Sequence, residues 1–437
     1  MSRRVRIANC SGFYGDRRTA AAEMVRGGPI DVLTGDWLAE LTMSILAMDR
    51  MQDPTGGFAR TFLPQLAPLL PELAERGIRV VSNAGGLAPR ALADAVRAEI
   101  DRQGLALKVA VVLGDDLSAK VRGWVADGRP LENAQTGDPL DPRRNPPLTA
   151  NAYLGCAGVK AALDAEADIV ITGRVTDAAV VMGAAAWWHG WAPDAWDALA
   201  GALAAGHVIE CGCQATGGNQ PFWERLDLRA VGFPIAEIEA DGSAVITKHH
   251  GTGGRVDRHS VTAQLLYEIG SAAYVSPDVV ARFDTLTLEE EGRDRVRISG
   301  TRGAPPPPTL KLGITAQAGW RNRMTAVIGG RDGLAKARLV EELAWELLGG
   351  REAFEDARSD VFTREPGAPR LPVDDLTLVD FSVRDPDPKK VGTRFTAPLI
   401  ELALASVPGF TFTTGPAKAR PVGVFWPVLV DRTEVPV

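Results

Sequence analysis

The first half of the chain repeats one pattern, in which a short run of β-branched and other apolar residues ends in a polar cluster. The strand-like runs occupy residues 5–8, 30–33, 78–81, 108–113, 168–171 and 207–209. Helical patterns, with apolar residues three or four positions apart, lie between them at residues 65–75, 89–103 and 153–165. Strands that alternate with helices in this way are parallel and are covered on both faces. The pattern therefore predicts an α/β fold, with a parallel sheet and flanking helices in the N-terminal half.

The polar clusters that follow the six runs contain Asn, Ser, Thr, Asp, Arg and Glu in addition to glycine. Parallel strands of one sheet end on the same rim, so the clusters are expected to open on one side of the sheet. Ligands bind outside this rim because free backbone donors and helix amino termini face it. Since tight turns alone need fewer polar side chains, the sequence predicts a binding crevice at the rim.

The pattern changes after about residue 232 to strand-like stretches of other types. These include residues 244–248, 295–299, 310–316 and 324–328. We therefore expect two domains. Residues 1–232 are predicted to form the parallel α/β domain with its strand-end site, and residues 233–437 an α+β domain that covers the crevice.

Charge and composition exclude several classes of partner. Lys and Arg total 48 against 55 for Asp and Glu, a net charge of -7, so no general basic field exists to attract nucleic acid. The longest apolar stretch, residues 178–188, has about half of the ~20 residues that a membrane span needs and is expected to be a buried helix. The N-terminus has no signal-peptide pattern, and four irregularly spaced cysteines make no disulfide framework. These features favour a cytoplasmic location.

The polar clusters also resemble those of a known protein family. The motifs are NCSGFYGDR at 9–17, DVLTGD at 31–36, SNAGG at 82–86, GDD at 114–116, ADIVITGRVTD at 167–177, QATGGN at 214–219, and His249 with GTGG at 251–254. In this order, from about residue 5 to 340, the chain resembles the acyclic terpene utilisation family of the AtuA type. Longer members carry a further ferredoxin-like domain, and the chain resembles a short form without that extension. The resemblance implies a bacterial catabolic setting, in which related proteins accompany the breakdown of acyclic terpenes through acyl-CoA esters.

Arg174 and Asp177 are the first pair of candidate functional residues. Arg174 directly follows the run at 168–171, and Asp177 begins the apolar helix pattern. A guanidinium at a strand end can hold a carboxylate or phosphate through two hydrogen bonds, and Asp177 is a candidate general base. The alternative is a structural Arg–Asp pair in which Asp177 caps the helix.

Asp36, Glu210 and His249 are further acid–base candidates. Each follows a strand-like run, so each can be held in place before a substrate binds. Asp36, Asp115 and Asp116 also suit a hard cation such as magnesium, although Asp115 and Asp116 can equally cap a helix or lie in solvent.

Other residues are predicted to bind the substrate because they lie in the polar and glycine-containing clusters. They are Asn9, Ser11, Tyr14, Arg17, Asn83, Asp116, Arg174, Thr216, Gly217, Gly218, Asn219, Lys248, Thr252 and Gly253. The spacing of Gly12 and Gly15 matches neither the dinucleotide fingerprint nor a P-loop, so neither NAD nor ATP is expected. We expect no cofactor, apart from CoA as part of a substrate.

Zinc and nucleophilic catalysis were weighed as alternatives. His207, Cys211, Cys213 and His249 are zinc-ligand types. Cys213, together with Cys10 and His250, departs from the family pattern, so no metal is predicted. Cys211 is interpreted as a small buried cysteine in preference to a nucleophile, and no Gly-x-Ser-x-Gly elbow supports a hydrolase.

Two functional hypotheses follow. The first is a cofactor-independent lyase or hydratase acting on a branched carboxylic acid or its CoA thioester, with Arg17 or Arg174 on the anionic end and Asp177, Glu210 or His249 moving the proton. The alternative is a non-catalytic subunit that binds an acyl-CoA or a partner enzyme. A small-molecule substrate and a homo-oligomer are expected, without nucleic acid or a membrane as partner.

The first hypothesis carries a geometric prediction. Six residues are expected to face one crevice: Asn9, Asp36, Asn83, Asp116, Arg174 and Glu210. His249 and the loop at 251–254 are expected to approach Arg174 from the second domain.

Overall fold

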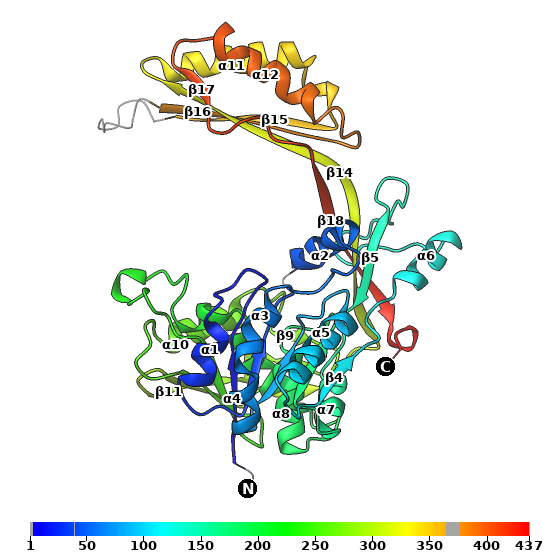
Figure 1. Cartoon of the computed structure of the whole chain (residues 1–437), viewed down its shortest axis with the longest axis vertical. Helices are drawn as coiled ribbons and strands as arrows, with labels where there is room; N and C mark the ends of the chain where they lie inside the picture. The colour runs from blue at the N-terminus through cyan, green and yellow to red at the C-terminus, as the bar shows by residue number, and fades with distance from the viewer. Residues whose placement is uncertain (1–2, 39, 364–375, 437) are drawn as a thin grey trace. The chain divides into compact units, whose positions relative to one another are not determined.

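The computed structural model describes residues 3–38, 40–363 and 376–436 (Figure 1). The chain divides into two compact units. Unit 1 contains residues 1–140, 148–315 and 425–437, and unit 2 contains residues 141–147 and 316–424.

A mixed sheet, nine-stranded within the described residues, forms the centre of unit 1. Its parallel part has the order β1-β2-β3-β6-β4, with β1 at Val5–Asn9, β2 at Val32–Gly35, β3 at Arg79–Ser82, β6 at Ile169–Thr172 and β4 at Val109–Val112. Antiparallel strands continue the sheet beyond β1 in the order β7 (Pro234–Ile238), β8 (Ala244–Lys248), β12 (Arg295–Ser299) and β11 (Thr287–Gly292). The predicted α/β fold with parallel strands is therefore confirmed.

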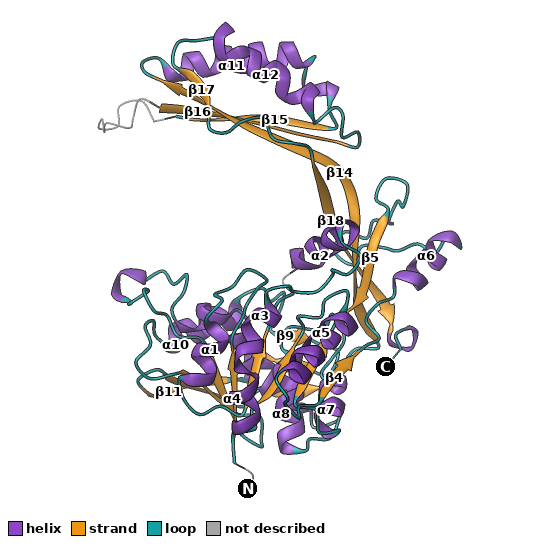
Figure 2. Cartoon of the chain, viewed as in Figure 1, coloured by secondary structure: helices purple, strands orange, loops and turns teal. Residues whose placement is uncertain are grey.

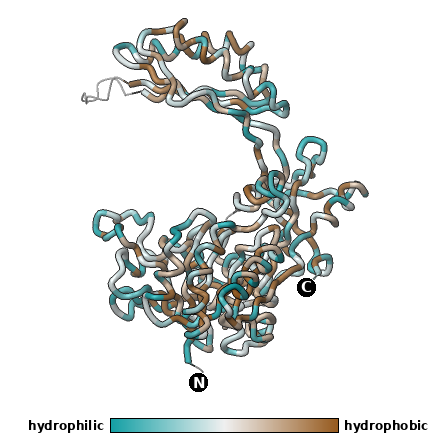
Figure 3. The backbone as a smooth tube through the Cα atoms, in the orientation of Figure 1, coloured by the Kyte–Doolittle hydropathy of each residue, from teal (hydrophilic) through white to brown (hydrophobic). Residues whose placement is uncertain are grey.

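Helices cover both faces of the sheet in unit 1 (Figure 2). One face carries α1 (Ala20–Arg26), α3 (Phe62–Leu66), α4 (Leu70–Arg76) and α5 (Pro89–Arg102), and the other α7 (Ala157–Asp164), α8 (Ala179–His189) and α9 (Trp196–Glu210). Strand side chains alternate between the faces, so Ile7 packs with the core under α8 and α9, and Ala8 with the core under α1 and α3. Hydrophobic segments gather inside the unit, and its loops are more hydrophilic (Figure 3).

Several smaller elements complete unit 1. They are α2 (Glu40–Gln52), α6 (Ser118–Ala126), α10 (Arg258–Leu266), β5 (Pro147–Ala152), β9 (Ala273–Val275), β10 (Val280–Arg282) and β13 (Arg302–Ala304). The apolar stretch at 178–188 forms α8, as expected. Across the described parts of the chain, no helix is both long and apolar enough to cross a membrane.

Unit 2 is an α+β unit with its own hydrophobic core. Its elements follow the order β14 (Thr309–Gly329), of which residues 316–329 belong to this unit, α11 (Gly333–Leu348), β15 (Asp356–Phe362), β16 (Leu376–Asp385), α12 (Thr393–Ala405) and β17 (Phe410–Phe412). The sheet order is β15-β16-β14-β17, and β18 (Arg420–Asp431) also pairs with β14. This β-α-β-β-α-β order is that of ferredoxin-like folds, a topology that the sequence patterns had not revealed.

Two sequence expectations differ from the structure. The run at 207–209, expected as a strand, is the last turn of α9, because a three-residue apolar run has no period of its own and continues the helix that begins at Trp196. Residue 232, expected as the domain boundary, lies inside unit 1 because β7 pairs with β1. The change of pattern at this point marks the change from parallel to antiparallel strands within one sheet.

Candidate active site

Most of the predicted polar clusters do meet at one rim. Asn9 ends β1, and residues 36, 83 and 174 follow β2, β3 and β6 within two positions of the strand end. These strands are parallel neighbours in the sheet. Their carboxyl ends therefore bring together side chains that are far apart in the sequence.

Arg174 is a buried cation that is held from several sides. Its side chain is 3% exposed, and its guanidinium donates to the carbonyl oxygen of Leu38 and, at 2.8 Å, to Oδ1 of Asp177. The guanidinium carbon lies 4.0 Å from the centre of the Tyr153 ring. Nε of Arg174 has no hydrogen-bond partner among the described residues. The side chain is thus fixed in position and retains one N–H for a ligand.

Asp36 is a buried acid beside this arginine. Its Oδ1 accepts hydrogen bonds from Nδ2 of Asn83 at 2.6 Å and from the backbone N–H of Leu38 at 2.8 Å. Burial raises the pKa of Asp36 to about 8, and the negative charge of Asp177 adds to the rise, whereas Arg174 opposes it. At neutral pH the Asp36 carboxyl therefore holds a proton and can donate a hydrogen bond.

Glu210 and His207 form a second buried acid–base pair on the last turn of α9. Oε1 of Glu210 lies 3.0 Å from Nδ1 of His207. Burial raises the pKa of Glu210, and the charge of Asp177 adds to this rise, while His207 opposes it. For His207 burial alone would lower the pKa, but the charge of Glu210 outweighs it, and the net shift is upward. The pair therefore shares a proton at neutral pH.

Oε2 of Glu210 has no hydrogen-bond partner within the described parts of the chain. The backbone of Tyr267 contributes to the raised pKa of His207 through a hydrogen bond. The His207 ring lies against Tyr274 and Phe283, with centres 5.1 and 5.9 Å away. The aromatic rings exclude water from the imidazole, and Oε2 of Glu210 is the atom of the pair that can exchange a proton with a ligand.

Asn9 attaches the end of α9 to the rim. Its Nδ2 donates to the carbonyl oxygens of Ile209 at 2.6 Å and Glu210 at 3.1 Å. These carbonyls belong to the last turn, where helix carbonyls lack partners within the helix. The following loop is equally close, since a Cβ at Gly12 would lie 2.7 Å from the backbone of Cys211. Asn9, predicted to bind substrate, thus positions Glu210.

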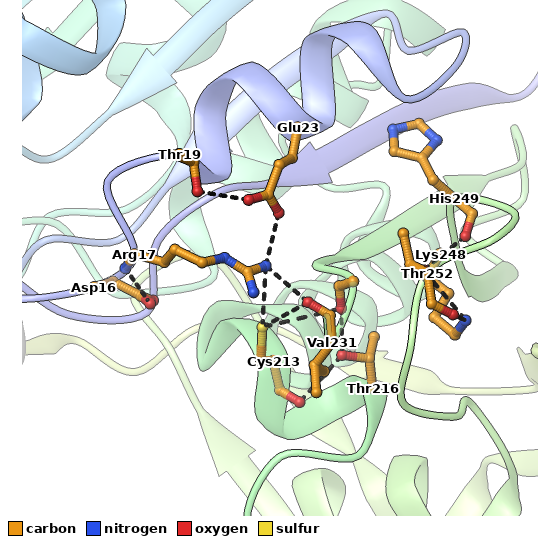
Figure 4. A network of polar contacts seen from close by, with 11 residues as sticks. Asp16, Arg17, Thr19, Glu23, Cys213, Thr216, Val231, Lys248, His249 and Thr252 are labelled. Carbon is orange, nitrogen blue, oxygen red and sulfur yellow. Dashed lines mark hydrogen bonds and ion pairs between the residues drawn. The ribbon is translucent and has the colours of Figure 1, made fainter. Parts of the chain in front are cut away.

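Arg17 is engaged within the protein, as Figure 4 shows. Its guanidinium donates to the carbonyl oxygen of Val231 at 2.7 Å, pairs with Glu23 at 2.8 Å and lies over the Phe233 ring. This arrangement holds the loop after β1 against the segment before β7. Nε of Arg17 has no hydrogen-bond partner among the described residues, so the binding of an anionic substrate by Arg17 stays a prediction.

Two neighbours of Arg17 in the sequence, Ser11 and Tyr14, also make internal contacts. Oγ of Ser11 donates to the carbonyl oxygen of Phe13 at 3.0 Å. The Tyr14 ring packs against two hydrophobic clusters of unit 1.

His249 and Lys248 lie in another set of contacts, also drawn in Figure 4. Nε2 of His249 is 2.9 Å from the carbonyl oxygen of Met24, on α1. Burial and the positive charges of Arg6 and Arg76 lower the pKa of His249. Nζ of Lys248 contacts Thr252 and Asp294. None of the described contacts of these two residues reaches Arg174. Because β8 runs parallel to β1, with β7 between them, His249 follows a strand end at the same edge of the sheet as Asn9, and its approach to Arg174 stays a prediction.

The two glycine loops pack against one another. The backbone N–H of Arg255 donates to the carbonyl oxygen of Thr216 at 2.6 Å, and that of Gly253 to Ala230 at 2.6 Å. A Cβ at Gly217 would lie 3.2 Å from Gly254. The predicted anion-binding loops at 216–219, including Gly218 and Asn219, and at 251–254 therefore use part of their backbone to hold each other.

Asp115, and not Asp116, belongs to the Arg174 group. Oδ2 of Asp115 accepts from the backbone N–H of Arg174 and from Nδ2 of Asn151, both at 2.8 Å. Burial raises the pKa of Asp115 to about 6. Asp116 is exposed and accepts from the backbone N–H of Ser118 at the start of α6. Asp116 therefore lies in solvent, one of the alternatives considered from the sequence, whereas Leu117 is the N-cap residue of α6.

The sequence missed two other members of the group, His207 and Tyr274. His207 lies three residues before Glu210, the spacing of neighbours on a helix face, and would have been found if this segment had been predicted as a helix. Within the described residues, no three His, Cys, Asp or Glu side chains are arranged to hold a metal ion. Burial and nearby carboxylates raise the pKa of Cys211, so its thiol stays protonated.

Comparison with known proteins gives one match. The model of a family described as acyclic terpene utilisation family protein AtuA matches residues 5–437, well past residue 340, where the resemblance seen in the sequence ends. No curated protein and no solved structure shows a significant match.

Proposed function

The chain belongs to the acyclic terpene utilisation family, and on this basis we propose that it is a catabolic lyase or hydratase with no cofactor of its own. Its substrate would be a branched carboxylic acid or the CoA thioester of one. The observation that carries the proposal is the buried group at the rim. There a fixed arginine lies beside Asp177 and Asp36. The negative charge of Asp177 also raises the pKa values of both members of the Glu210–His207 pair.

Each side chain of this group suits one part of the reaction. Asp177, 31% exposed, is the base that reaches a substrate. It takes a proton from the carbon beside the carboxyl or thioester carbonyl. Arg174 and the protonated Asp36 donate hydrogen bonds to the oxygen on which negative charge develops.

The Glu210–His207 pair completes the elimination. The bond between the neighbouring carbon and its hydroxyl breaks, a carbon–carbon double bond forms, and the departing oxygen takes a proton from the pair and leaves as water. The proton on Asp177 returns to the pair through solvent. Addition of water is the same sequence in reverse.

Turnover by the purified protein tests this proposal. A panel of branched hydroxyacyl-CoA esters and the matching free acids is incubated with the protein, and mass spectrometry follows loss or gain of water. Asp177→Asn is expected to lower turnover at least about a hundredfold, as removal of a general base does, while the ligand still binds. Asp101→Asn, an exposed acid on α5, serves as the matched control.

Binding of these compounds without turnover would favour the alternative, a non-catalytic subunit. Equal turnover by wild type and Asp177→Asn would remove Asp177 from the mechanism.

A further inference from the structure

A groove in unit 1 borders the Arg174 group and is not used by the chemistry above. Two cavities of about 540 and 400 Å³ adjoin, because both are lined by Arg50, Leu87 and Asp116. Asp115 lines the larger cavity and also accepts the backbone N–H of Arg174. The groove and the candidate active site are therefore separated by a single residue at this point.

Three arginines and two carboxylates, Asp115 and Asp116, line the groove, so its charged side chains are more often positive than negative. Arg50 lines both cavities, Arg90 the larger and Arg122 the smaller, and none of the three has an ion pair with a described residue. The helices α5 and α6 begin at the groove, where Ala91 and Ala119 belong to their first turns, and in α6 the first N–H already donates to Asp116. The first N–H groups of a helix lack partners within it and favour anions. The groove is thus suited to negative charge.

Two buried polar atoms independently indicate a ligand. Asn151 is 3% exposed and lines the larger cavity, and Thr149 is 9% exposed and lines the smaller. Oδ1 of Asn151 and Oγ1 of Thr149 have no hydrogen-bond partner among the residues that the structure describes. Buried polar atoms are normally paired, and both residues line the groove, so a ligand there would supply the missing partners after a small rotation of the two side chains.

We propose that the groove binds the phosphorylated, amide-containing handle of an acyl thioester, as found in coenzyme A. The inference rests on the proposed function and selects the thioester over the free acid as the substrate. Phosphate oxygens are bound by the arginines and the helix N-termini. Amide groups of the handle pair with Asn151 and Thr149, and its alkyl parts lie on Leu87. The acyl group is then directed towards Arg174.

Calorimetric titration of the full chain with coenzyme A itself, which carries no acyl group, tests the groove separately from catalysis. Wild type is expected to bind, and Arg50→Ala to weaken binding by about tenfold, the loss expected for a charge-assisted contact. Arg18→Ala is the control, since Arg18 is also exposed and has no ion pair with a described residue but lies outside the groove. Asn151→Ala is expected to weaken binding of coenzyme A but not of inorganic pyrophosphate. Thermal unfolding verifies that each variant is folded.

The outcomes separate the two proposals. Absence of coenzyme A binding, or equal affinity of folded Arg50→Ala and wild type, would overturn the groove assignment even if free acids are turned over. If pyrophosphate bound as tightly as coenzyme A, the groove would be a site for anions in general. That result would also overturn the assignment of the groove to coenzyme A. If Arg50→Ala and Asn151→Ala weaken the binding of coenzyme A but no thioester is turned over, the groove assignment is supported and the proposed catalytic function is wrong.

Discussion

Single residues at the rim derive their chemistry from burial. Asp36 is 6% exposed and lies beside another carboxylate, so its pKa rises to about 8, far above that of an aspartate in water. The folded protein therefore keeps a proton that the unfolded chain releases. Stability contributed by this protonated state is present at low pH and is lost as the pH rises towards about 8.

Asp36→Asn is expected to reduce this loss, because an amide cannot ionise and still offers an oxygen to Leu38 and Asn83. Between about pH 5 and 9 the variant should become more stable relative to wild type by on the order of a few kcal/mol. Thermal unfolding at several pH values measures the effect. Asp101→Asn should follow wild type, and parallel pH profiles of wild type and Asp36→Asn would contradict the assignment.

At the scale of elements, α9 matters because its last turn carries the acid–base pair. Asn9 on β1 satisfies the carbonyls of Ile209 and Glu210 and so joins helix to strand. Asn9→Ala is expected to leave the buried carbonyl of Glu210 without this partner and that of Ile209 with only the backbone N–H of Cys211, at a cost of about 1–3 kcal/mol in the free energy of unfolding. Denaturant titration measures this cost.

Asn9→Ala should also affect activity through Glu210, lowering kcat more than it raises KM and moving the acid limb of the pH–rate profile. Gln135→Ala, an exposed amide, is the control for both measurements. An unchanged pH–rate profile in a destabilised variant would show that Asn9 is structural alone.

At the scale of the whole molecule, each unit has a separate hydrophobic core. Phe395 is fully buried in the core of unit 2 and Phe233 in a core of unit 1. Phe→Ala at such positions costs about 3–5 kcal/mol. We expect Phe395→Ala to lower amide-exchange protection in residues 316–424 and to leave unit 1 protected, and Phe233→Ala to do the opposite. Hydrogen exchange with mass spectrometry measures the protection of each unit. If either substitution lowered protection in both units, the two units would unfold together as one cooperative unit.

The sequence by itself determined where the parallel strands lie and where they end. Apolar runs separated by helical periods favour βαβ units, and a polar residue directly after such a run lies at the rim, as Asn9, Asp36, Asn83 and Arg174 do. The same local reasoning failed for residues 207–209, because a three-residue run is too short to show a period. It also favoured Asp116, whereas the structure places Asp115 in contact with Arg174, because spacing along the chain does not show the direction of neighbouring side chains.

Only the tertiary structure decided which polar residues share a site. Arg17 and His249 have suitable chemistry, but packing directs them to Val231 and to α1. Asn9 and Glu210 are about two hundred positions apart and meet because α9 packs on the sheet. The raised pKa values of Asp36 and Glu210 come mainly from burial. Spacing along a chain determines local conformation, whereas burial and long-range contacts depend on how all the elements pack together.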